Sequence, residues 1–280
     1  MGSGGRRRVS TKLWLGLGAF ALVSAQAGSQ APADKAPRGA PAAAAPSGPS
    51  GGEGGGEGGE GGEGGIDAAR ASSDPVAFLV ALDVVAAHYA AGRDVYRAGE
   101  AQAAGEMFAH PIAEVYTELE PVLAALGVPA FRNEMERASA LALDRAPAAE
   151  VDRAADAVAA ALRSAERRAP GAGATPVAQA RAIAEMADRA ALQHAAALRE
   201  PDALGPYLDG YGLYRAAADR AGRVVPALEA AGRHEAAAAI RNVLGSLAAA
   251  YPGPTRPAAP TGTAADALLG EASRLKLLLD

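Results

Sequence analysis

Apolar residues recur every three to four positions from Ser73 onward, which is the period of an α-helix with one buried face. Serine, aspartate and proline at positions 73–75 form a typical helix start, because proline tolerates the first turn. No later segment alternates apolar and polar residues long enough to indicate a strand. The pattern therefore predicts an all-α protein in which helical hairpins pack as a bundle.

Proline and glycine divide this region into helices. A first helix is expected from Pro75 to about Ala98, and a second from Pro111 to Gly127 with a kink at Pro121. Similar apolar stripes follow within 151–162, 183–198, 207–218 and 240–251. We expect the bundle to cover 73–252, followed by a Pro/Gly/Thr linker over 253–263 and a C-terminal helix over 264–280.

The first 27 residues have the features of a signal peptide. Four positive charges between positions 6 and 12 precede an apolar run, and the small-x-small triplet at 25–27 is the pattern that signal peptidase accepts. The run is shorter than the roughly 20 residues that span a bilayer, and no comparable stretch follows it. We therefore expect a periplasmic or secreted protein and not an integral membrane protein.

Residues 28–72 are predicted to form a disordered tether. Ala, Pro, Ser and Gly dominate 28–50, and glycine with isolated glutamates fills 51–65. A segment of this composition cannot bury enough apolar area to offset the entropy lost on ordering. Loose cation capture by the glutamates would require that ordering, so a solvated spacer is the favoured interpretation.

Charge and cysteine content exclude several classes of function. The formal net charge is -5, and it becomes -9 once a leader with four positive charges and no acids is removed, which argues against nucleic acid as a partner. The chain has no cysteine, so it forms no disulfide, no Fe-S cluster and no covalent c-type haem.

Two short patterns recur at almost the same offset. The form H-x-A-A-x-R-acid starts at His88 and again at His194, and a P-x-L-x-A-x-G stretch starts at Pro121 and again at Pro226. Duplicated half-bundles over 73–168 and 176–252 would explain both repeats. Chance agreement is the alternative in a chain this rich in alanine.

An exported helical chain with repeated hairpins and inward histidines resembles the imelysin-like group, which includes periplasmic components of bacterial iron uptake. The acidic-tyrosine stretch 201–207 is similar to segments of iron-permease-associated helical domains. The resemblance covers about 75–251 and implies a helical bundle with a role in metal handling. The G-x-H-x-x-E signature of imelysins is absent, because the third residue after His88 is Ala91 and after His194 is Ala197.

Histidines and glutamates supply the candidate metal ligands. Both His88 and His194 are predicted to face the interior, where each is either a hydrogen-bonded core residue or part of a shared site. Glu100, Glu114 or Glu118 could complete a ligand set for Zn, Fe or Cu. His110 stands four residues before Glu114, which suits ligands on one helix face, but its position before a proline favours a helix cap.

Tyr207, Tyr211 and Tyr214 share one helix face, either as core or as the wall of a pocket for an apolar ligand, and the neighbouring Gly210 and Gly212 permit a close crossing. No serine-hydrolase elbow, H-E-x-x-H motif or phosphate loop occurs. The leading hypothesis is a periplasmic helical-bundle binding protein that handles a metal ion such as iron. The alternative is a structural module that binds an exported or membrane protein and no ligand, and a distant third is an imelysin-type hydrolase.

Overall fold

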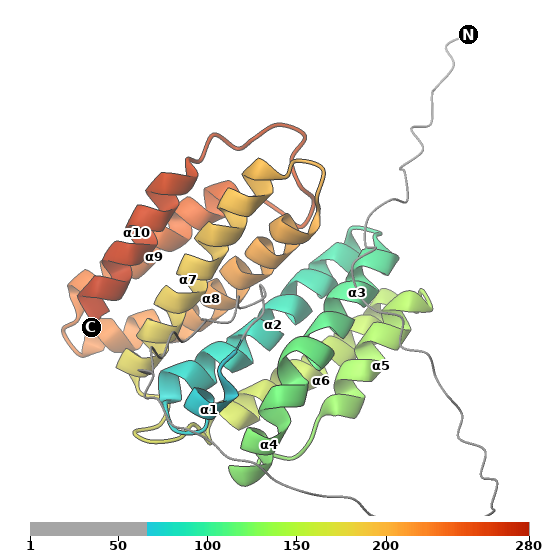
Figure 1. The fold of residues 1–280 in the computed structure, drawn as a ribbon, viewed down its shortest axis with the longest axis horizontal. Coiled ribbons are helices and arrows are strands. Elements are labelled where there is room, and N and C mark those ends of the chain that lie inside the picture. Colours follow the sequence, from blue (N-terminus) through green and yellow to red (C-terminus); the bar gives the residue numbers. More distant parts are fainter. Residues whose placement is uncertain (1–65, 280) are drawn as a thin grey trace, which may run out of the picture. The chain divides into compact units, whose positions relative to one another are not determined.

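The structure is a computed structural model that describes residues 66–279 (Figure 1). These residues form helices and connecting segments with no strand, so the all-α prediction is confirmed. The predicted signal peptide and most of the predicted tether lie outside the described residues. The tether boundary at 72 is wrong, because α1 (Ala68–Ala71) is capped by Asp67 and buries Ala71 against the core.

Four helical segments of the first half close into a ring. The first and third segments, α2 and α5, each pack against both the second segment, which begins with α3, and the fourth, α6. The segments are α2 (Pro75–Arg97), the run α3 (Ala101–Pro111), η1 (Ile112–Tyr116) and α4 (Thr117–Ala125), then α5 (Arg132–Leu143) and α6 (Ala148–Glu166). This arrangement is an antiparallel four-helix bundle with short connections.

The second half repeats this arrangement with α7 (Pro176–Arg199), α8 (Gly205–Ala230), α9 (His234–Ala250) and α10 (Ala265–Leu279). Neighbours along the chain pack together, and α10 closes the ring by packing against both α7 and α9 (Figure 1). The expected half at 176–252 is therefore too short. The apolar stripe of α10 is buried and completes the second ring.

The turn that follows α4 is built like the turn that follows α8. Gly127 has a φ of 70° and Gly232 has a φ of 73°, a left-handed conformation that suits glycine at a helix end. In each turn the next residue's N–H reaches back to a leucine carbonyl, at 2.9 Å for Leu123 and 2.8 Å for Leu228. This likeness agrees with the predicted duplication, which remains a prediction.

The helix expected to begin at Pro111 begins ten residues earlier in the structure, at Ala101. Proline lacks an N–H and its ring clashes with the carbonyl four residues before it. The helical run nevertheless continues past Pro111 and passes directly into the π-helical turn η1. His110 therefore lies in the last turn of α3, and the prediction that it caps a helix is wrong.

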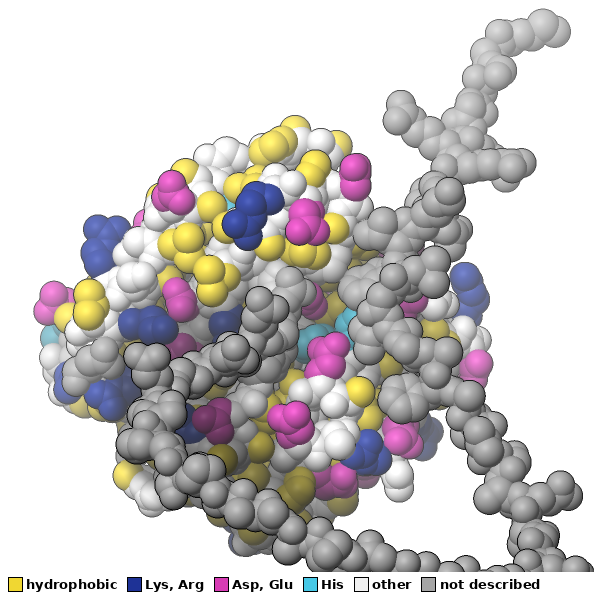
Figure 2. All heavy atoms as spheres, in the orientation of Figure 1, with side chains coloured by type: hydrophobic (Ala, Val, Ile, Leu, Met, Phe, Trp, Pro, Cys, Tyr) yellow, Lys and Arg dark blue, Asp and Glu magenta, His cyan; other side chains and the backbone are white. Residues whose placement is uncertain are grey.

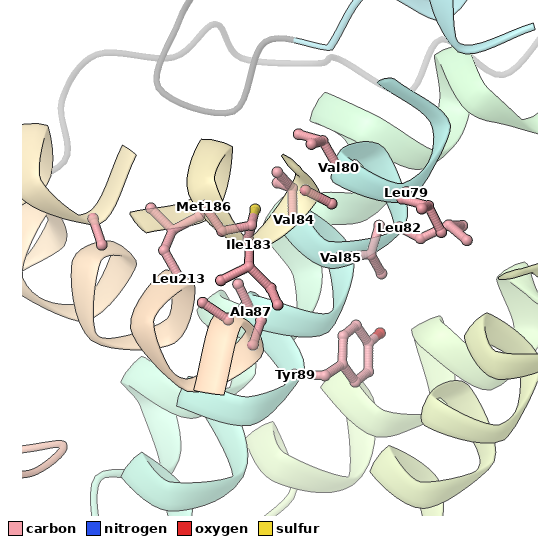
Figure 3. Close-up of a cluster of buried hydrophobic side chains, with 14 of the residues drawn as sticks. Leu79, Val80, Leu82, Val84, Val85, Ala87, Tyr89, Ile183, Met186 and Leu213 are labelled. Carbon is pink, nitrogen blue, oxygen red and sulfur yellow. The ribbon is translucent and has the colours of Figure 1, made fainter. Parts of the chain in front are cut away.

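The central helix α2 is a member of the first ring and packs against the second, since it contacts α3 and α6 on one side and α7 and α8 on the other. Figure 3 shows Val84 beside Ile183 and Met186, while Leu79 and Val85 lie on the opposite side of α2. A helix covered on several sides has apolar residues around its whole circumference.

By length and composition alone, α2 could cross a membrane, so the expectation that no comparable apolar stretch follows the first 27 residues is wrong. In the structure 72% of its most apolar window is buried inside the bundle, as expected for the core helix of a soluble protein. The expectation that the chain is not an integral membrane protein stays a prediction.

Candidate functional site

His88 lies near the middle of α2 and is 8% exposed. Its Nδ1 is 2.9 Å from the carbonyl oxygen of Val84, and a carbonyl can only accept, so Nδ1 carries the hydrogen. The lone pair is then on Nε2, which lies 3.8 Å from Oδ1 of Asp209 on α8. The backbone of α2 thus fixes the tautomer and aims the basic nitrogen at a carboxylate.

A second imidazole lies next to His88. The ring centroids of His88 and His110 are 6.3 Å apart and their planes meet at 72°. Figure 2 shows histidine side chains (cyan) next to one another and beside acidic side chains (magenta) on this face of the molecule. We call His88, His110 and Asp209 the histidine–aspartate cluster, which draws one residue each from α2, α3 and α8.

Burial lowers the pKa of His88 to about 4, and the nearby His110 contributes in the same direction. The hydrogen bond to Val84 acts against this shift but does not cancel it. At neutral pH the imidazole is therefore neutral, which is the form that accepts a proton or binds a metal ion.

The lowered pKa predicts a loss of stability in mild acid. Between pH 6.5 and 4 the unfolded state binds a proton at His88 that the folded state does not, so acidification lowers the free energy of unfolding. At pH 5 this loss amounts to about 2 kcal/mol relative to pH 7.5. Urea unfolding at the two pH values should show that His88→Gln removes this part of the pH dependence.

The matched control for this experiment is His234→Gln, since His234 is exposed on α9 and is not part of the cluster. That variant should keep the pH dependence of the unmodified protein. An unchanged pH dependence in His88→Gln would show that His88 titrates normally in the folded state.

The structure gives His194 a different set of partners from those of His88. His194 is 4% exposed, its Nε2 is 3.0 Å from the carbonyl oxygen of Thr263, and its ring lies 5.7 Å from that of Tyr251. Both histidines are buried as predicted, but the residues that contact His88 come from α3 and α8. No contact between His88 and His194 occurs among the described residues.

The glutamates expected to complete a ligand set lie at the surface. Glu100, Glu114 and Glu118 are all exposed, and no described contact joins any of them to a histidine. Within residues 66–279, no group of three or more His, Asp or Glu side chains is arranged to hold a metal ion as it stands. The carboxylate that does approach a histidine is Asp209, which the sequence analysis did not single out.

The three tyrosines of α8 have different surroundings. Tyr207 donates to the carbonyl of Gly253 at 2.7 Å and lines a cavity of about 270 Å³ beside His194. Tyr211 donates to Oδ2 of Asp94 at 2.8 Å, across the interface with α2. Tyr214 stacks on Tyr251, with ring centroids 6.5 Å apart. The three tyrosines therefore do not form one pocket wall, although Tyr207 lines a cavity.

Gly210 and Gly212 mark close crossings, as predicted. A Cβ at Gly210 would lie 1.8 Å from the hydroxyl of Tyr251, and a Cβ at Gly212 would lie 2.5 Å from the carbonyl oxygen of Ala87. The second crossing brings α8 onto α2 close to His88, and it contributes to the position of Asp209.

Comparisons of the chain with protein-family models, curated proteins and solved structures find no match. The resemblance to the imelysin-like group therefore stays a prediction. The case for a function rests on the contacts described above.

Proposed function

We propose that this chain is an exported helical-bundle protein that binds a transition-metal ion through the histidine–aspartate cluster. The observation that carries the proposal is the fixed tautomer of His88, whose Nδ1–H is held by the Val84 carbonyl while Nε2 faces Asp209. Metal-binding histidines commonly donate their other ring N–H to a backbone carbonyl in this way. Two imidazoles and one carboxylate suit Zn, Cu or Fe.

The distance between His88 and Asp209 is close to the distance between two ligand atoms that bind the same metal ion. Two ligand atoms on a tetrahedral ion with bonds of about 2.0–2.1 Å lie about 3.3 Å apart. His88 Nε2 and Asp209 Oδ1 are 3.8 Å apart, so a small movement of either side chain suffices for these two. His110 has to rotate toward them to become the third ligand, and water would complete the coordination. Neutral His88 needs no deprotonation before it binds.

The test is a titration of the tag-free chain with Zn²⁺ and Cu²⁺ in competition with a chromophoric chelator. We expect one ion per chain, and we expect His88→Ala and Asp209→Asn each to weaken binding by about a hundredfold, because loss of even an outer-sphere partner costs about 10–100-fold. Circular dichroism before each titration confirms that the variants are folded.

Two histidines outside the cluster provide matched controls. His194→Ala and His234→Ala should leave the affinity unchanged, since His194 contacts Thr263 and Tyr251 and His234 is exposed. A chain that takes up neither ion, or a His88→Ala variant that binds as tightly as the unmodified protein, would contradict the proposal.

The alternative of a partner-binding module also has a supporting observation. Three large apolar side chains, Leu192, Leu198 and Leu204, are exposed where α7 leads into α8, and Leu198 also lines the cavity beside Tyr207. Large exposed apolar side chains, where they form a patch, are typical of surfaces that contact another protein. Failure of the metal titration would favour this alternative, with an exported or membrane protein as the partner.

A further inference from the structure

A cleft separate from the histidine–aspartate cluster lies between α2, α6 and α8. Its volume is about 200 Å³, and alanines from all three helices line it: Ala86, Ala90, Ala155, Ala159 and Ala216. Both α6 and α8 pack against α2, and these small side chains leave the space between the helices open. Five arginines also line the cleft.

The deep end of the cleft is closed by a satisfied ion network. Arg220 is 2% exposed and donates to both carboxylate oxygens of Asp83, at 2.7 and 2.6 Å, and to Glu166 at 3.0 Å. A buried arginine that is fully engaged by acids holds the helices together and has no capacity left for a ligand. The arginines nearer to solvent are in a different situation.

In the cleft, the partner that holds Arg93 among residues 66–279 is an exposed one. Its Nη1 donates to Oδ1 of Asp156 at 2.8 Å, and Asp156 has 67% of its side chain exposed. The Nε of Arg93 is buried and has no hydrogen-bond partner among the described residues. A buried donor without an acceptor is costly, while an exposed ion pair stabilises little. An incoming acceptor would therefore be favoured here.

A further arginine of the cleft carries an unpaired charge. Arg163 lines the cleft and forms no ion pair with any residue in the described part of the chain. Arg223 pairs with Asp219, whose side chain is 77% exposed, and also with Glu166 at 3.8 Å, so it is held more firmly than Arg163. Arginine presents Nε–H and Nη–H as a planar fork that matches a carboxylate.

We propose that this cleft binds a small organic monoanion, with its carboxylate on Arg93 and its apolar body on the alanine floor. The apolar floor favours an organic ligand over a bare inorganic ion. The acids that also line the cleft, Asp156 and Asp219 among them, would repel a dianion more than a monoanion. The ligand replaces Asp156 as the partner of Arg93.

Benzoate is a suitable probe, because it carries one carboxylate on an apolar ring. We expect it to bind with a dissociation constant in the millimolar range or below, as a ligand of this size does. Spectra of the full chain with ¹³C-labelled alanine methyl groups should show shifts concentrated on the alanines of the cleft. Benzamide, its neutral analogue, should not bind, and inorganic phosphate should not shift the same methyl groups.

Paired substitutions on neighbouring turns isolate the effect of the cleft. Arg93→Gln should weaken benzoate binding about tenfold or more, because a charge-assisted bidentate contact is lost. Arg97→Gln is the matched control, since Arg97 pairs with Asp152 at 3.0 Å between the same two helices but does not line the cleft. That variant should bind benzoate as the unmodified protein does.

Asp156→Asn tests the proposed displacement directly. Removing the competing carboxylate should tighten benzoate binding about two- to fivefold, whereas Asp152→Asn should leave it unchanged. Ala159→Leu should abolish binding by filling the cleft, because Ala159 is half-buried at its wall. Benzamide binding as tightly as benzoate, phosphate shifting the same methyl groups, or unaltered affinity in both Arg93→Gln and Asp156→Asn would overturn the proposal, as would the absence of binding.

Discussion

Replacing Gly212 with alanine should destabilise the protein by about 2–3 kcal/mol, since extra atoms in a well-packed interior force neighbours apart. A Cβ at this position would lie 2.5 Å from the carbonyl oxygen of Ala87 and 3.0 Å from its carbonyl carbon. Both are backbone atoms of α2, so no side chain can rotate out of the way. The crossing between α2 and α8 has to open instead.

Gly222→Ala is the matched control on the same helix. Its added Cβ would meet nothing within 4 Å, and Gly222 is inside α8. Alanine is the better helix former, so this variant should gain about 0.5–1 kcal/mol. Urea unfolding followed by circular dichroism measures both changes. Equal effects of the two substitutions would mean that α8 does not approach α2 as closely as described.

The second large effect is expected at Arg220. Burial alone would lower its pKa, but Asp83 and Glu166 outweigh burial and raise it, so the guanidinium stays charged. Asp83→Leu leaves that buried charge without its bidentate partner and should cost about 3–5 kcal/mol of unfolding free energy. The network also reaches Gln179 of α7, so the loss affects contacts among four helices.

The double variant Asp83→Leu/Arg220→Leu separates charge burial from lost packing. Apolar replacement of both members of a buried pair is often close to neutral, so the double variant should recover much of the loss. Glu229→Ala removes an exposed pair with Arg241 and should cost less than about 1 kcal/mol. A single Asp83→Leu effect as small as that of Glu229→Ala would contradict the buried ion network. Urea unfolding again provides the measurement.

The fold class was predictable because it depends on local periodicity, and the stripes at Phe78, Leu82 and Val85 are buried as expected. The continuation of a helix through Pro111 was not predictable. A proline usually ends a helix, yet α3 includes Pro111 and passes directly into the π-helical turn η1. The place of α10 in the second ring likewise depends on contacts with α7, more than sixty residues earlier in the chain.

The candidate site was predictable only in part. The burial of His88 followed from its helical face, but its neighbours come from other helices. Asp209 is separated from His88 along the chain by most of the bundle, and its only local signal was its place between Tyr207 and Tyr211 in α8. The arginines of the cleft carried no motif, because helix packing and not sequence spacing places Arg93 of α2 and Arg163 of α6 in the lining of one cleft.

The position of α2 between the two rings has a consequence for synthesis. α2 ends at Arg97, while α8 begins only at Gly205, so the apolar side of α2 that α8 covers emerges long before its cover is made. The first ring can assemble around one side of α2, but the other side stays open to water until the second half arrives. During that interval the nascent chain exposes apolar surface, which favours aggregation.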